Sequence, residues 1–281
     1  MDAVGDEAKG AWPADLVARP CPVSASAWHT EALRRTADPV RARYHRAWLR
    51  HLADPDDPDT APLVSVVIPV RDGNAWIGDA VGSALRQTWR RTEVVVVDDG
   101  SSEPPDRVLP RDPRLRILRQ PPQGVARARN RGVREARGEL VHLLDADDWL
   151  DPSCVARKVD ALRRVPDADL CVASYRVVGA HREKSARTHH PPRLGDALCP
   201  TRDLLETVMR RYPFHTSTVL AARWRLLTTA MDETLEHGED ARCWFRLAVD
   251  GAKVVALRRA LGTRRFVPTG LTSRASAQRL S

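Results

Sequence analysis

Apolar segments that end in turn or acidic residues constrain the fold of this chain most strongly. The segments LVSVVIPV (63–70), EVVVVDDGS (93–101) and ELVHLLDADDW (139–149) each indicate a strand of a buried sheet. Apolar residues at helical spacing lie between them, over 76–88 and 125–137. This alternation predicts an α/β fold with a mostly parallel sheet flanked by helices. Ligands of such sheets bind beyond the carboxyl ends of the strands, where both acidic clusters fall.

The rest of the chain divides into an extension and further α/β elements. Residues 1–60 are expected to form an N-terminal helical extension, with a helix over 40–52 and a Pro- and Asp-rich linker over 53–62. A loop rich in His, Arg and Pro is expected at 179–200. The other expected strands are 114–120, 168–178, 217–222, 253–257 and about 261–267, and the other expected helices are 152–164, 201–211 and 239–250.

The charge and the cysteines limit the classes of function. The net charge is +8, from 45 Lys and Arg residues against 37 Asp and Glu residues. This excess suits phosphate-bearing ligands or an anionic membrane surface, or it reflects a solvated Arg-rich surface, which is the interpretation we favour. No basic run is interleaved with aromatic residues, so we expect no nucleic acid partner. The five cysteines form no CxxC pair, which argues against a disulfide framework or a zinc site and favours a reducing compartment.

The N-terminal segment is acidic and lacks a basic region followed by an apolar one, so it does not indicate a secretory signal. No apolar run approaches the length that spans a bilayer. We therefore expect a cytoplasmic protein without a transmembrane segment, and leave peripheral membrane contact and the oligomeric state open.

The sequence LLDADDW places Asp145 and Asp147 two residues apart at the end of an expected strand. If the backbone stays extended, both carboxylates point to one side and repel each other unless a cation lies between them. Oxygen ligands of this kind suit Mg²⁺ or Mn²⁺. The alternative is a polar strand end in which Asp148 or Asp151 caps a helix that begins near Pro152.

In VVVVDDGSS, Asp98 and Asp99 end a second buried strand, and Gly100 opens a tight turn. A carboxylate at this position is suited to accept hydrogen bonds from a nucleotide base or from ribose hydroxyls. The alternative is an ordinary strand-to-turn transition. Because four valines precede the acidic pair, we favour contact with a ligand.

Two expected helix starts carry further candidate residues. Gly124 begins a helix whose early residues Arg129 and Asn130 favour an anionic or carbonyl-rich ligand, or simply form a solvated basic face. Glu239 and Asp240 fall in the first turn of the last expected helix, where the helix dipole favours their ionised form. Such a carboxylate is a usable general base, although capping the helix is the simpler explanation of this motif taken alone.

Taken together and in this order, these motifs resemble the family-2 glycosyltransferases with the GT-A fold. The resemblance covers about 63–267. It rests on VSVVIPV (64–70), VVVVDDGSS (94–102), GVARARNRG (124–132), LLDADDW (143–149) and GEDARCWFRLA (238–248). It implies a GT-A domain over 61–267, with a Rossmann-like nucleotide-binding half at about 63–150, an acceptor-binding half at about 151–267 and a C-terminal tail at 268–281.

The resemblance also implies the chemistry and the residues that perform it. The implied reaction moves a sugar with inversion from a nucleotide-sugar, commonly a UDP-sugar, to an acceptor hydroxyl, with Mn²⁺ or Mg²⁺ as cofactor. By position in the motifs, Asp147 would hold the metal and Asp240 would be the general base, with Glu239 as its neighbour. The implied donor-binding residues are Pro69, Val70, Asp98 or Asp99, Arg129, Asn130, Asp145 and Ala146.

The chain departs from the family pattern at two places. The family usually has an aromatic residue and Asn after the first strand, where this chain has Arg71 and Asp72. Near the C-terminus the family often has Arg followed two residues later by His, whereas GTRRFVP (262–268) offers Arg264 and Arg265 without that His.

These departures motivate the alternative of a catalytically impaired relative that binds nucleotide-sugars or a partner protein without transfer. A phosphotransfer enzyme is disfavoured because its Asp-x-Asp motif typically follows the first strand, and here the motif follows the fourth. A dinucleotide-dependent dehydrogenase is disfavoured because no GxGxxG follows the first strand.

Overall fold

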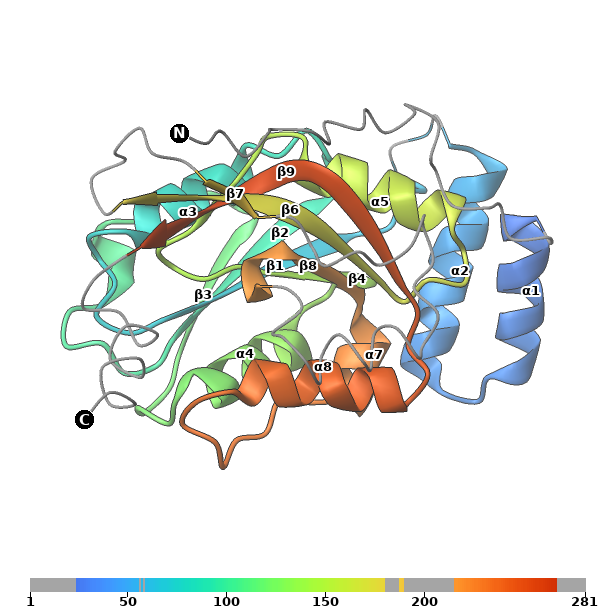
Figure 1. Ribbon diagram of the computed structural model, residues 1–281. Coiled ribbons are helices and arrows are strands. Elements are labelled where there is room, and N and C mark those ends of the chain that lie inside the picture. The colour runs from blue at the N-terminus through green and yellow to red at the C-terminus, as the bar shows by residue number, and fades with distance from the viewer. Residues whose placement is uncertain (1–23, 56, 58, 180–186, 190–214, 267–281) are drawn as a thin grey trace, which may run out of the picture.

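The computed structural model describes residues 24–55, 57, 59–179, 187–189 and 215–266 of the chain. These residues form one nine-stranded sheet with helices on both faces (Figure 1). The strands are β1 (Val64–Val70), β2 (Thr92–Asp98), β3 (Leu115–Arg119), β4 (Leu140–Leu143), β5 (Trp149–Leu150), β6 (Leu170–Gly179), β7 (Arg187–His189), β8 (Val219–Ala222) and β9 (Val254–Phe266). The helices are α1 (Ala25–Arg35), α2 (Pro39–Ala53), α3 (Ile77–Leu85), α4 (Val125–Glu135), α5 (Cys154–Arg164), α7 (Arg223–Thr228) and α8 (Glu239–Val249), with 3₁₀ turns η1 (Pro105–Arg107) and η2 (Thr216–Thr218).

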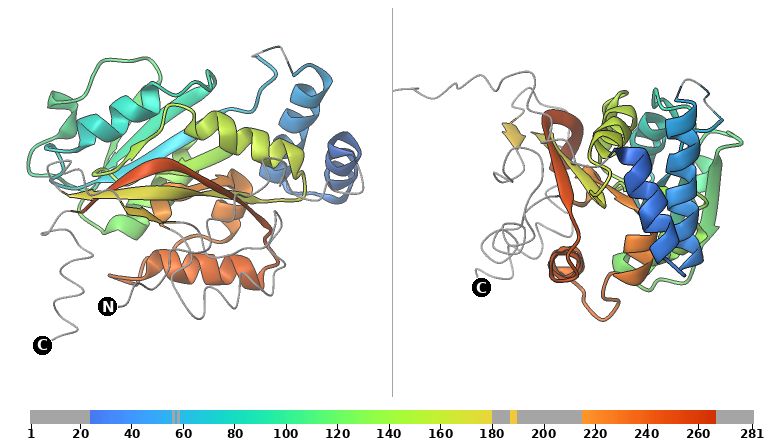
Figure 2. Two further views of the ribbon diagram at one scale, coloured as in Figure 1. Left: turned by 45° about the horizontal axis from the view of Figure 1, so that its top comes forward. Right: turned by 90° about the vertical axis from the view of Figure 1, so that its right-hand side faces the viewer.

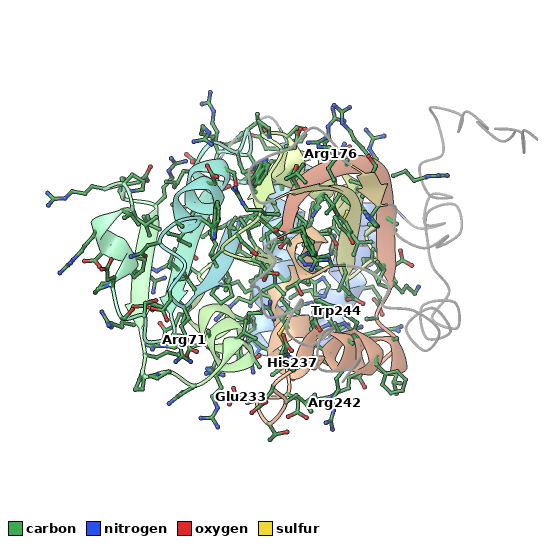
Figure 3. The ribbon with its side chains drawn as sticks, turned by 60° about the vertical axis from the view of Figure 1, so that its left-hand side comes forward. Arg71, Arg176, Glu233, His237, Arg242 and Trp244 are labelled. Atoms are coloured by element: carbon green, nitrogen blue, oxygen red, sulfur yellow. The ribbon has the colours of Figure 1, made fainter. Side chains whose placement is uncertain are left out.

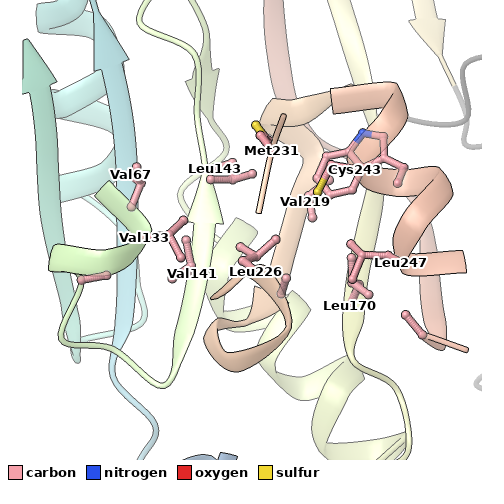
Figure 4. Close-up of a cluster of buried hydrophobic side chains, with 14 of the residues drawn as sticks. Val67, Val133, Val141, Leu143, Leu170, Val219, Leu226, Met231, Cys243 and Leu247 are labelled. Carbon is pink, nitrogen blue, oxygen red and sulfur yellow. The ribbon is translucent and has the colours of Figure 1, made fainter. Parts of the chain in front are cut away.

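The first half of the sheet is parallel, as the sequence predicts. The order β3-β2-β1-β4 joins these strands through parallel pairs only. Alternate residues of the buried strands face opposite layers because side chains in a strand alternate. Val67 packs in the cluster that contains α4 and α8, and Val66 packs in the cluster that contains α3 (Figures 1 and 4). The continuous valine runs therefore serve two cores.

Helix α4 lies unusually close to β1. A Cβ added at Gly132 would lie 2.3 Å from the Val67 Cγ1 atom, well inside van der Waals contact. Glycine at this position thus allows the helix to approach the strand. The close contact fixes α4, which carries Arg129 and Asn130, relative to the carboxyl end of β1.

The second half of the sheet is mixed. Strand β8 pairs antiparallel with both β4 and β6, and β6 pairs parallel with β9. The prediction of two strands at 253–257 and 261–267 is wrong, because β9 runs continuously over both. The pairing of β9 with β6 shifts its register around Ser174, between Leu257 and Ala260 of β9. The exposed Arg258 and Arg259 lie in this irregularity of the pairing and not in a loop between two strands.

The N-terminal helices pack side by side at one end of the molecule (Figure 2). The expected helix at 40–52 is confirmed as α2, whereas α1 was not predicted from the sequence. Trp48 of α2 is fully buried in a cluster with Val64 of β1 and Leu140 of β4. This part of the chain therefore shares a core with the sheet, while the domain boundary near residue 60 stays a prediction.

The remaining expectations are confirmed in part. The predicted strands 114–120 and 168–178 correspond to β3 and β6, and the helices 152–164 and 239–250 correspond to α5 and α8. Most of the predicted loop at 179–200 lies outside the described residues, and the part that is described contains β7. The predicted helix at 201–211 and the tail at 268–281 also lie outside the described residues. Within the described part of the chain, no helix combines the length and apolar character needed to cross a membrane.

Candidate active site

The carboxyl ends of β1, β2 and β4 meet at one edge of the sheet and carry both acidic clusters. The Asp99 backbone N donates to the Val70 carbonyl at 2.8 Å, and the Leu144 N donates to the Val67 carbonyl at 3.0 Å. Both acidic clusters therefore begin next to β1, the strand that lies between β2 and β4. The expectation that residues 98–99 and 145–147 share one edge of the sheet is confirmed.

Residues 145–148, here called the acidic turn, follow β4. The expectation of an extended strand through Asp145 and Asp147 is wrong, because β4 ends at Leu143 and the Asp148 N donates to the Asp145 carbonyl at 3.1 Å. The turn directs Asp148 inward, where only 1% of it is exposed. Its carboxylate accepts hydrogen bonds from the Ser217 Oγ at 2.6 Å and from the Arg265 N at 3.0 Å. Hydrogen bonds from two segments distant in the sequence to this buried carboxylate therefore accompany the departure from extended geometry.

Residues 215–217, here called the 215–217 segment, lie against the acidic turn. The Asp145 N donates to the Ser217 Oγ at 3.0 Å. The two ring nitrogens of His215 lie 3.7 Å from the Asp145 Oδ2 and 3.6 Å from the Asp148 Oδ2. Asp145, Asp148 and His215 each offer one ligand atom, and these atoms lie within 4.8 Å of one another.

The electrostatics of this group suit a divalent cation. Burial and the neighbouring Asp145 raise the pKa of Asp147 to about 6. Burial, Asp147 and Asp145 raise the pKa of Asp148 well above its usual value. Burial lowers the pKa of His215 to about 4, so its imidazole is neutral near pH 7 and keeps a lone pair for a metal. A cation would relieve the mutual repulsion of these carboxylates, and a carboxylate-rich donor set fits Mn²⁺ or Mg²⁺.

The predicted base, Asp240, lies at the start of α8 and contacts the same segment. Gly238, in the left-handed conformation with φ of 81°, turns the chain into this helix. Thr216 Oγ1 donates to the Asp240 Oδ2 at 3.1 Å, and the Ala241 N donates to its Oδ1 at 2.8 Å. The 215–217 segment therefore links the acidic turn to Asp240.

The predicted donor-binding residues Arg129 and Asn130 are occupied by contacts within the protein. The buried Arg129 guanidinium donates to the Asp145 Oδ1 and to the Glu239 Oε1, both at 2.7 Å. Asn130 Nδ2 donates to the Met231 carbonyl at 2.8 Å, and its Oδ1 accepts from the Met231 N at 2.9 Å. These two residues of α4 hold the acidic turn, the start of α8 and the loop before α8 together. Figure 3 shows that loop through Glu233 and His237, with Arg242 and Trp244 on the helix that follows.

The acidic pair at the end of β2 also has partners within the protein. Asp98 Oδ1 accepts from the Ser101 N at 2.9 Å. The Asp99 carboxylate accepts from Gln120 Nε2 at 2.7 Å, and from the backbone N–H groups of Gln123 at 2.9 Å and Gly124 at 2.8 Å. These contacts fix the loop that leads into α4. Contact of either carboxylate with a nucleotide base stays a prediction.

The end of β1 and the residues that follow it lie at the same edge of the sheet as the two acidic clusters. Pro69 and Val70 are buried, and Ala146 of the acidic turn is half-buried. Arg71 and Asp72, which depart from the family pattern, are exposed, and Figure 3 labels Arg71. Asp72 has a positive φ of 50°, and its carboxylate accepts two hydrogen bonds from Ser102, from the N at 2.8 Å and the Oγ at 2.7 Å. This contact ties the end of β1 to the turn after β2.

The two C-terminal arginines have different surroundings. The Arg265 guanidinium lies 4.3 Å from the ring centroid of Trp76 and 4.9 Å from that of Trp149, and donates to the Asp79 Oδ2 at 2.6 Å. Its Nε donates to the Asp147 carbonyl at 3.2 Å, so Arg265 stabilises the backbone of the acidic turn. Arg264 alternates to the other face of β9 and is half-buried. Its charge opposes the rise in the pKa of Asp147 that burial and Asp145 cause.

Sequence reasoning missed the 215–217 segment and the inward position of Asp148. The segment lies beside the acidic turn because β8 is antiparallel to β4, with Leu220 paired to His142. The residues before β8 therefore lie next to those after β4. The only signal in the sequence was His215 followed by hydroxyl residues directly before an apolar run. The position of this segment beside the acidic turn depends on β8 running antiparallel to β4, and hydrophobic periodicity does not show the direction of a strand.

Comparisons with known proteins agree with this arrangement. Residues 65–230, more than half of the chain, match the model of the family described as Glycosyl transferase family 2. The uncharacterized glycosyltransferase EpsJ of Bacillus subtilis is 32% identical over 139 residues, which cover 47% of this chain and 38% of that protein. Chondroitin synthase of Pasteurella multocida is 29% identical over 194 residues, which cover 68% of this chain and 19% of that protein. The matched regions thus span less than half the length of either relative.

Solved structures share the fold. TarS of S. aureus in complex with UDP has a TM-score of 0.58 and 19% identity, over 73% of this chain and 61% of that chain. Mannosyltransferase PcManGT from Pyrobaculum calidifontis, in complex with GDP-Man and Mn²⁺, has a TM-score of 0.58 and 21% identity, over 91% of this chain and 71% of that chain. The fold is the GT-A type that the sequence motifs imply. With its ordered motifs, its matching fold and the family match over 65–230, the chain belongs to glycosyl transferase family 2.

Proposed function

We propose that this protein is a metal-dependent, inverting glycosyltransferase that moves a sugar from a UDP-sugar to an acceptor hydroxyl. The observation that carries the proposal is the 215–217 segment. Ser217 forms hydrogen bonds with the acidic turn, and Thr216 forms a hydrogen bond with the candidate base Asp240. The proposed cation-binding group and the proposed carboxylate base both contact this one short segment, and metal-assisted transfer from a nucleotide diphosphate would use both.

The proposed cation is Mn²⁺ or Mg²⁺, held by Asp147 on the donor diphosphate. Within the described residues Asp147 accepts no hydrogen bond from another side chain, and its ionised form is disfavoured by burial and by Asp145. Asp145, Asp148 and His215, whose ligand atoms form a group that does not include Asp147, are the proposed further ligands. When bound, the cation stabilises the negative charge that develops on the leaving diphosphate.

Asp240 is the proposed general base. Its carboxylate would accept the proton of the acceptor hydroxyl as that oxygen forms a bond to the anomeric carbon. The bond between that carbon and the diphosphate oxygen breaks on the opposite face, which inverts the configuration and releases the nucleoside diphosphate. The half-buried Arg264 lies near the acidic turn and is the proposed cationic partner of the diphosphate, in place of the family's usual His.

Uridine diphosphate is the proposed nucleotide because TarS, which shares this fold, was solved with UDP. Pro69, Val70, Ala146 and one of Asp98 and Asp99 are the proposed residues on its nucleoside side. We place the reaction in the cytoplasm, since the described cysteines Cys154, Cys171 and Cys243 are free and buried, as in a reducing compartment.

The test is transfer and hydrolysis of UDP-sugars with Mn²⁺ present, in the wild type and in an Asp240→Asn variant. Loss of a general base lowers kcat by about 10²- to 10⁴-fold, with little change in the donor KM. Glu236→Gln, at an exposed acid before α8, is the matched control and should keep full activity. Binding of UDP-sugars without turnover by the wild type would instead support the impaired relative that binds but does not transfer.

A further inference from the structure

Lys158 of α5 is buried in the core beneath the candidate site, with only 1% of it exposed. Its ammonium donates to the Thr218 carbonyl at 2.6 Å and lies 2.9 Å from the His142 Nε2. Among the described residues no Asp or Glu forms an ion pair with it. Lys158 also forms a hydrogen bond with the Cys154 thiol. Burying an ammonium group without a carboxylate is costly, so these polar contacts must hold it in place.

The hydrogen bonds of His142 define the direction of the contact with Lys158. The His142 Nδ1 lies 2.8 Å from the Leu143 carbonyl, so Nδ1 carries the proton and donates it. The Nε2 atom therefore has a lone pair, which accepts from the Lys158 ammonium. Burial and the charge of Lys158 lower the pKa of His142 well below its usual value, which keeps the ring neutral. Lys158 thus joins β4, through His142, to η2, through Thr218.

Both ends of this link lead directly into the candidate site. Thr218 is followed by β8 and preceded by Ser217, which bonds to Asp145 and Asp148. His142 lies on β4, three residues before the acidic turn. The two contacts of one ammonium group therefore set the spacing between the end of β4 and η2.

We propose that Lys158 is a positioning residue that fixes the 215–217 segment against the acidic turn and so shapes the site for the cation and the donor diphosphate. The proposal rests on the proposed function, since it assigns Lys158 a role in that same site. It predicts that a change at Lys158 weakens cation binding although no atom of Lys158 belongs to the cation-binding group.

The test is Mn²⁺ binding in the presence of UDP, measured by electron paramagnetic resonance of the free ion, in the wild type and in Lys158→Met. The substitution keeps an unbranched side chain and removes all three donors. Loss of a residue that orients metal ligands weakens metal affinity by about 10- to 100-fold. Two controls should bind Mn²⁺ as the wild type does. Val159→Ala, at the next residue of α5, leaves a cavity in the core, and Lys253→Met removes a surface ammonium paired with Asp167.

A double-mutant cycle with Ser217→Ala identifies the route of the effect. If Lys158 acts through the 215–217 segment, Lys158→Met should weaken Mn²⁺ binding by no more than about 3-fold in the Ser217→Ala background. Equal fold-changes in both backgrounds would overturn the proposed route.

Wild-type affinity for Mn²⁺ in a folded Lys158→Met variant would overturn the proposal, as would an equal loss in Val159→Ala of similar melting temperature. If Lys158→Met does not fold, Lys158→Gln replaces it in the test. This variant keeps one donor group, so it should lose Mn²⁺ affinity to a smaller extent. Wild-type Mn²⁺ affinity in Lys158→Gln would overturn the proposal. The wild-type arm reports separately on the proposed function. If the wild type binds no Mn²⁺ with UDP, the proposed donor is wrong and the role of Lys158 falls with it.

Discussion

Arg129 connects the two acidic ends of the candidate site through one guanidinium group. It is buried between Asp145 and Glu239, and both carboxylates lie 2.7 Å from its nitrogen atoms. Burial alone would raise the pKa of Asp145, but Arg129 and then His215 lower it, so that the net shift is downward. Arg129, which the motif predicted to contact the nucleotide, therefore keeps Asp145 ionised and links it to α8.

Replacing Arg129 by Met should destabilise the protein strongly, because Asp145 and Glu239 would remain buried without their partner. Breaking a buried ion pair in this way costs about 3–5 kcal/mol of the free energy of unfolding. Urea denaturation measures the change. Arg127→Met, at an exposed ion pair two residues earlier in α4, is the control and should cost no more than about 1 kcal/mol. Similar losses in both variants would contradict the structural role of Arg129.

At the scale of elements, the close approach of α4 to β1 depends on Gly132. A methyl group at Gly132 has no room beside Val67. Gly132→Ala should therefore displace the helix and destabilise the protein by about 1–3 kcal/mol, although alanine favours helices intrinsically. Gly78→Ala in α3, where nothing lies within 4 Å of the added Cβ, should be neutral or slightly stabilising. Thermal unfolding of the two variants checks the contrast, and a neutral Gly132→Ala would contradict the packing.

The elements that the sequence predicted well are those whose pattern is local. The continuous apolar run of β2, which is buried at every residue, and the amphipathic spacing of α8 follow from residues a few positions apart, and both elements lie where they were expected. The acidic turn and the 215–217 segment could not be predicted in this way. Their geometry depends on β8 running antiparallel to β4 and on the buried partners of Asp148, which are separated from it by 69 residues at Ser217 and by 117 at Arg265.

At the scale of the whole molecule, the described core contains histidines that must stay neutral. Burial is the main cause in each case, and it lowers the pKa of His29 to about 3 and of His45 to about 4. These two rings meet between α1 and α2, with their Nδ1 atoms 3.0 Å apart. Burial likewise lowers the pKa of His51, His142 and His215.

These shifts predict that stability falls as the pH drops below 6.5. Between that value and about 4, the unfolded chain binds protons that the folded protein does not, so His29 and His45 each cost about 1.4 kcal/mol at pH 5.5. Urea denaturation at pH 7.5 and 5.5 measures the loss. A variant with both His29→Leu and His45→Leu should lose about 3 kcal/mol less over this interval than the wild type. Equal losses in the two proteins would contradict the neutral state of this pair.

The central claim is that the acidic turn and the 215–217 segment form one site for a cation-bound nucleoside diphosphate. The most direct measurement is the melting temperature with UDP, with Mn²⁺ and with both, in the wild type and in Asp147→Ala. A ligand at about 100 times its Kd adds roughly 2.7 kcal/mol, or about 5–10 °C for a chain of this size. We expect this shift only for UDP and Mn²⁺ together, and we expect Asp147→Ala to remove it. An equal shift with UDP alone, or one that survives in Asp147→Ala, would contradict the account.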